Sequence, residues 1–95
     1  MTTDENKKPK ISVLCVAVGK VIAARRAYLK RPFKKFCREA GCTDAYLYLL
    51  ENGRMNMSIN YLEALAKSLG MTASGVLKKA EKEVVRGAGK SQATA

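Results

Sequence analysis

Residues 33–53 read FKKFCREAGCTDAYLYLLENG, and the organisation of the whole chain can be worked out from them. Gly41 suits the left-handed cap that ends a helix, so a helix is predicted over about 33–40. Thr43 follows two residues later and suits the N-cap of another helix over about 44–51. A helix, a short turn containing glycine and a second helix are the outline of a helix-turn-helix.

Helical signals continue towards the C-terminus. Asn52 and Gly53 form a strong turn signal, which ends the helix that Thr43 begins. Ser58 predicts the N-cap of a fourth helix, and Thr72 predicts that of a fifth, which fades near Gly87.

The segment 11–18 carries conflicting signals. Its valines favour a strand on propensity, whereas its apolar residues also recur at helical spacing. The spacing slightly favours a first helix that begins near Ser12 and continues past Gly19, but both structures stay open. Pro32 then suits the beginning of the next helix.

The predicted fold class is therefore all-α, a compact five-helix bundle that contains a helix-turn-helix. A chain of 95 residues is expected to form one domain. We expect a flexible basic arm over 1–10, a helix-turn-helix DNA-binding domain over 11–86 and a flexible tail over 87–95.

Charge and composition restrict the function. The chain has 18 Lys and Arg against 8 Asp and Glu, a formal charge of +10, which predicts a polyanionic partner such as nucleic acid. There is no His to serve as a general base, and the carboxylates are scattered, so the chain is not expected to be an enzyme. We expect no cofactor.

The three cysteines cannot form a four-ligand zinc site without His, so no metal is expected. Their odd, sparse set favours reduced thiols in a cytoplasmic protein. Cys37 lies among cations that would favour its thiolate, although no base accompanies it. The apolar run 11–18 is too short to cross a membrane.

Three groups of residues resemble the lambda-repressor-like helix-turn-helix family. They are the Ala-Gly-Cys-Thr turn at 40–43, the Leu-Glu-Asn-Gly at 50–53 and the Leu-Ala-Lys-Ser-Leu-Gly at 65–70. The resemblance covers about residues 19–80. It implies five helices, a third helix that enters the major groove, and a dimer on a two-fold operator. It also implies that Glu51 is mainly structural.

On that docking, the chain is predicted to be a sequence-specific DNA-binding transcriptional regulator and a repressor, with double-stranded DNA as its partner. The residues expected to face bases are Thr43, Asp44, Ala45, Tyr48, Leu49 and Asn52. Those expected on phosphates are Arg31, Lys34, Lys35 and Arg38, which lie within a run of eight cations over 20–38, and Arg54, which follows the third helix. Lys7, Lys8 and Lys10 would form a minor-groove arm.

An alternative follows from the same helix. Residues 39–52 contain no Lys or Arg, and good hydrogen bonds to guanine or adenine need Arg, Lys, Asn or Gln. Tyr48 and Leu49 could instead anchor a protein partner, which would make the chain a helix-turn-helix scaffold that acts as an anti-activator or a complex subunit.

Overall fold

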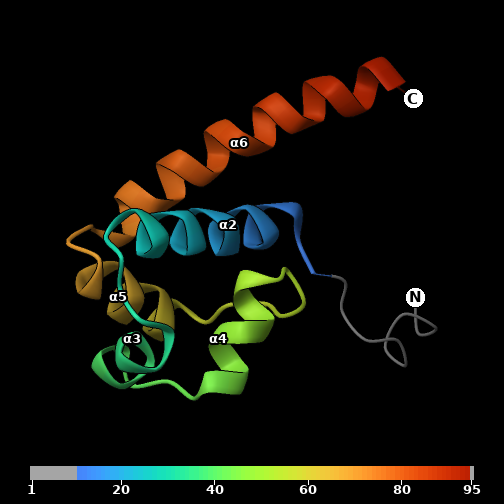
Figure 1. The fold of residues 1–95 in the computed structure, drawn as a ribbon. Coiled ribbons are helices and arrows are strands. Elements are labelled where there is room, and N and C mark those ends of the chain that lie inside the picture. The colour runs from blue at the N-terminus through green and yellow to red at the C-terminus, as the bar shows by residue number, and fades with distance from the viewer. Residues whose placement is uncertain (1–10, 95) are drawn as a thin grey trace.

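The computed structural model describes the backbone of residues 11–94 and the side chains of residues 11–86. Within this range the chain forms five helices and no strand (Figure 1). The helices are α2 (Val13–Tyr28), α3 (Phe33–Ala40), α4 (Asp44–Glu51), α5 (Ile59–Ser68) and α6 (Ala73–Thr94). The predicted all-α bundle with a helix-turn-helix is confirmed.

The side-chain caps that the sequence predicts begin four of these helices. In each, a hydroxyl oxygen accepts a hydrogen bond from the backbone N–H three residues later, which satisfies one of the free donors in the first turn. The four capping residues are Ser12, Thr43, Ser58 and Thr72, with distances of 3.0 to 3.2 Å. The segment 11–18, left open between helix and strand, is therefore helical from Val13 onward.

Helix α2 lies at the centre of the bundle. Figure 1 shows α6 along one side of α2, with α3 and α4 on the other side. The single core cluster of the bundle includes the fully buried side chains of Ile22, Phe36, Leu50 and Leu65. Burying these apolar side chains is the main stabilising contribution in a domain of this size.

Helices α2 and α4 approach each other closely at Gly19. A Cβ atom at this position would lie 2.1 Å from the carbonyl oxygen of Leu50, which is a backbone atom and cannot rotate away. Only glycine allows this contact, so Gly19 sets the distance between α2 and α4.

The predicted end of the last helix is wrong. Helix α6 continues to Thr94 instead of fading near Gly87, so the expected tail is largely helical. Glycine lowers helix propensity by only about 1 kcal/mol, and the segment 87–94 has no proline to interrupt the hydrogen-bond ladder. None of the helices in the described range is long and apolar enough to cross a membrane.

Candidate nucleic-acid interface

The turn between α3 and α4 is the local structure that positions the site. Gly41 takes the left-handed conformation with φ of 78°, and its N–H donates to the carbonyl oxygen of Cys37 at 2.9 Å. The N–H of Cys42 donates to the same oxygen at 3.0 Å, and Thr43 then caps α4. The chain turns within three residues because glycine adopts this conformation without strain.

The inner side of the turn is closed by buried sulfur and leucine. Cys37, Leu47 and Leu50 are buried in the core, and half-buried Cys42 packs against it. Burial raises the pKa of the Cys37 thiol to about 12. The thiolate that neighbouring cations would favour therefore does not form near neutral pH, because desolvation outweighs those charges.

The outer side of α4 holds most of the residues expected to face bases. Thr43, Asp44 and Ala45 are exposed, and Tyr48 is 55% exposed. Leu49 is half-buried, so it presents only part of its side chain to a partner.

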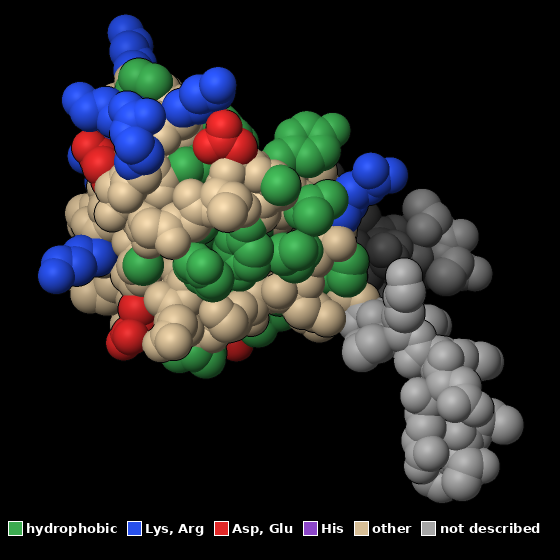
Figure 2. All heavy atoms as spheres, turned by 90° about the horizontal axis from the view of Figure 1, so that it is seen from below, with side chains coloured by type: hydrophobic (Ala, Val, Ile, Leu, Met, Phe, Trp, Pro, Cys, Tyr) green, Lys and Arg blue, Asp and Glu red, His purple; other side chains and the backbone are tan. Residues whose placement is uncertain are grey.

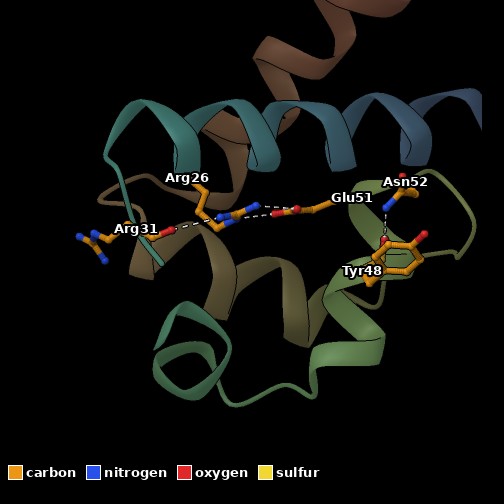
Figure 3. Close-up of polar contacts among 5 residues, drawn as sticks. All are labelled: Arg26, Arg31, Tyr48, Glu51 and Asn52. Carbon is orange, nitrogen blue, oxygen red and sulfur yellow. Dashed lines mark hydrogen bonds and ion pairs between the residues drawn. The ribbon is translucent and has the colours of Figure 1, made fainter. Parts of the chain in front are cut away.

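Asn52 is exposed, but one of its polar groups is already engaged. Its Nδ2 donates to the carbonyl oxygen of Tyr48 at 2.7 Å and caps the end of α4 (Figure 3). The bond leaves the second N–H of that amide and its oxygen for other contacts.

Tyr46 belongs to the bundle and not to the outer face. Its ring stacks on that of Tyr61 with centroids 4.3 Å apart, and it packs against the core. Tyr46 is therefore a packing residue of the bundle.

Four of the five cations expected on phosphates are exposed to solvent. Lys34, Lys35 and Arg38 lie on α3, and Arg54 follows α4. Within the described residues, none of the four forms an ion pair with a carboxylate. Their charges are therefore free to meet an anion.

Figure 2 views the side on which α3 and α4 lie. Lys and Arg side chains gather mainly at one edge of this face, and hydrophobic side chains occupy its centre. Basic and apolar surfaces thus lie next to each other there.

Arg31 occupies a different position from the other four cations. Its Nη1 donates to the carbonyl oxygen of Ser68 at 2.9 Å and to Glu39 at 3.2 Å. The guanidinium ties the beginning of α3 to the end of α5, and its phosphate contact stays a prediction.

Arg26 belongs to the run of eight cations over 20–38, but its guanidinium is engaged within the bundle and is not available to a polyanion. Its guanidinium lies between α2 and α4 and pairs with both carboxylate oxygens of Glu51, at 2.8 and 3.0 Å (Figure 3). It also donates to the carbonyl oxygen of Arg31 at 3.1 Å. The hydrogen bond to Glu51 raises the pKa of Arg26 above its ordinary value. Only 20% of the Arg26 side chain and 9% of the Glu51 side chain are exposed.

The pairing of Arg26 with Glu51 is the main contact that reasoning from the residues missed. The two residues are 25 positions apart, and no local pattern links them. Arg25 is also engaged, since its Nε donates to the carbonyl oxygen of Leu69 at 3.3 Å. The predicted arm residues Lys7, Lys8 and Lys10 lie outside the described residues.

The architecture is that of a helix-turn-helix bundle. Comparison with protein-family models finds no match, and comparison with curated proteins finds none. Two crystal structures of the clp gene regulator ClgR from Corynebacterium glutamicum are similar to this chain. The first has a TM-score of 0.81 and 23% identity, and covers 88% of this chain and 89% of that chain. The second has a TM-score of 0.68 and 25% identity, and covers 80% and 96%. The chain shares the fold of that regulator.

Proposed function

We propose that this chain is a DNA-binding transcriptional regulator, and not an enzyme, that places α4 in the major groove. The phosphates on either side of the groove would then meet Lys34, Lys35, Arg38 and Arg54. Phosphate contacts of this kind position a protein on the duplex without reading its sequence.

The observation that carries this proposal is the cluster of exposed cations on α3, none of them paired with a carboxylate of the described residues, beside the exposed outer face of α4. Basic residues that face solvent without a carboxylate partner lower the cost of binding a polyanion, because no internal ion pair must be broken. The fold shared with a gene regulator supports the same conclusion.

Base reading by this helix would rely on short and apolar side chains. Asp44 can accept a hydrogen bond from cytosine, and Ala45 can contact a thymine methyl group. Tyr48 adds exposed surface to that helix. Specificity is therefore expected to come from a small number of modest contacts.

The first test is selection of bound duplexes from a random DNA pool at about 150 mM salt. Enrichment of a two-fold symmetric motif is expected if the proposed repressor reads its operator as a homodimer. Recovery of duplexes that share no sequence motif would show that the cations bind the DNA backbone while α4 does not read bases.

A charge reversal isolates the cationic surface. Lys34→Glu with Lys35→Glu should lower affinity for all duplexes about 100-fold and reduce the steepness of the salt dependence by about 1.8 in log–log slope. The matched control is Lys79→Glu with Lys82→Glu, which changes the net charge equally on α6. Equal losses in the two double variants would contradict docking through α3.

A second candidate function is favoured by the exposure of Tyr48 on a helix surface that carries no cation. Here the chain acts as a helix-turn-helix scaffold for a protein partner, with Tyr48 as the main anchor and Leu49 beside it. Exposed aromatic side chains at the centre of an interface often carry much of the binding energy.

Tyr48→Arg separates the two candidates. On DNA, the added cation should maintain or strengthen affinity, whereas an apolar protein interface should lose its partner. Affinity for the selected duplex is the measurement, and Leu49→Arg is the weaker companion because its side chain is half-buried.

A further inference from the structure

A second surface lies between α2 and α6, in a groove of about 690 Å³. Its floor is apolar and includes Val21, Ala24 and Met71. Lys20, Arg25, Lys79, Lys82 and Arg86 also line it. We refer to this surface as the α2–α6 groove.

The floor of the α2–α6 groove continues onto an exposed aromatic ring. Tyr28, another lining residue, is 75% exposed, and the guanidinium of Arg25 lies 5.7 Å from the centre of its ring. Exposed aromatic surface of this kind, next to aliphatic surface, is typical of places where a partner binds.

The walls of the groove are strongly basic. Five cations line it against one carboxylate, Glu83, which already lies 3.4 Å from Arg86. Within the described residues, no ion pair engages Lys20, Lys79 or Lys82. The groove therefore has a positive excess, since its one carboxylate, Glu83, pairs only with Arg86.

The groove lies on the side of α2 that faces away from α4. Gly19 and Arg26 contact α4, whereas Val21, Ala24 and Tyr28 follow at positions about half a helical turn around the axis. A partner in this groove would therefore leave α3 and α4 uncovered.

We propose that the α2–α6 groove binds an acidic, amphipathic helix of a partner protein. The charge of the walls selects for an acidic segment, and the floor accepts apolar anchors spaced three and four residues apart. On α6 the lining residues Lys79, Lys82, Glu83 and Arg86 form one face over about two helical turns, which matches a short docked helix.

Other occupants fit the groove less well. A second copy of this chain would bring the same cations against this face and be repelled. A small ligand would stay largely in solvent, because long lysine side chains and not closed walls surround the floor. Nucleic acid would use the cations but leave the apolar floor and Tyr28 without contacts.

The test uses a fluorescent helical peptide of about 18 residues, with leucines at helical spacing on one face and glutamates on the flanks. The control peptide replaces its leucines with serine and retains every charge. Fluorescence anisotropy with the full chain measures both. We expect the leucine peptide to bind at least about tenfold more tightly. Equal binding of the two peptides, or no binding of either, would overturn the proposal.

Two double variants then locate the site. Lys79→Glu with Lys82→Glu should weaken peptide binding about tenfold or more, whereas Lys34→Glu with Lys35→Glu should change it by less than about twofold. The same net charge in both variants makes them matched controls. Equal weakening would show attraction to overall charge only and would refute the groove.

Backbone amide shifts provide a direct map of the contact. Peptide titration should shift the resonances of Val21, Ala24 and Met71 and leave those of Lys34 and Lys35 in place. Shifts centred on α3 would overturn the assignment. Displacement of the peptide by duplex DNA without sequence preference would assign the groove to nucleic acid and would also overturn it.

Discussion

The two helices of the helix-turn-helix have the same length but opposite surface chemistry. Helix α3 carries exposed Lys34, Lys35 and Arg38 on its outer side. Helix α4 carries no cation and exposes Asp44 and Tyr48 among small and apolar neighbours. On our proposal, affinity would come mainly from α3 and sequence preference from α4.

The helices also differ in how the rest of the molecule holds them. Helix α4 is fixed to α2 by the close approach at Gly19 and by the ion pair of Arg26 with Glu51. The outer cations of α3 form no such contacts within the described residues. A cation near this site is therefore not automatically available to DNA. Arg26 instead holds α4 against α2 through its ion pair with Glu51.

Gly19→Ala should have the largest effect on stability. The added Cβ meets the Leu50 carbonyl oxygen, so α4 must move or the helices must separate, at a cost of about 3 kcal/mol in the free energy of unfolding. Urea denaturation measures this loss. Gly75→Ala is the control, since its nearest neighbour is a side-chain oxygen at 3.1 Å. A change below about 1 kcal/mol for Gly19→Ala would break the assignment of α4 as the constrained helix.

Arg26→Met should cost about 2 kcal/mol, because the Glu51 carboxylate loses its partner while remaining largely buried. Arg38→Met is the matched control on α3. It should leave stability within about 0.5 kcal/mol of the parent and lower DNA affinity instead. Similar stability losses in both variants would remove the distinction between a structural and an available arginine.

Gly41→Ala should cost about 1 kcal/mol, since φ of 78° is unfavourable for alanine while no atom lies near the added Cβ. Gly70→Ala has the same strain, with φ of 71°, at the junction of α5 and α6. Both should lose stability equally, but only Gly41→Ala should also change DNA affinity, because it lies between α3 and α4. Equal DNA affinity of the two variants would argue against docking through this turn.

The smallest effect at neutral pH concerns Cys37. Its pKa is raised from 9.0 to about 12 in the folded chain, so unfolding favours ionisation as pH rises. The contribution of this thiol to stability should be constant below pH 9 and should be lost between about pH 9 and 12. Burial also raises the pKa values of Cys42 and Tyr46, which steepens the same decline. Urea midpoints across this range test it, and Cys37→Ala should show a shallower slope.

Local sequence was sufficient to predict where most helices begin. Each N-cap side chain accepts a hydrogen bond from a backbone N–H only three residues later, so the two partners are close in the sequence. The four capping residues are Ser12, Thr43, Ser58 and Thr72. The end of α6 was misjudged because glycine at 87 weakens a helix without ending it. Exposure of the α3 cations was likewise predictable from their position on a short amphipathic helix.

The sequence by itself determined the all-α class, the turn at Gly41 and the basic character of the chain, because these depend on residue type and near neighbours. Only the tertiary structure decided which cations remain available. The partner of Arg26 lies 25 residues away, and the walls of the α2–α6 groove come from opposite ends of the chain. Such contacts depend on how helices pack, which no local spacing specifies.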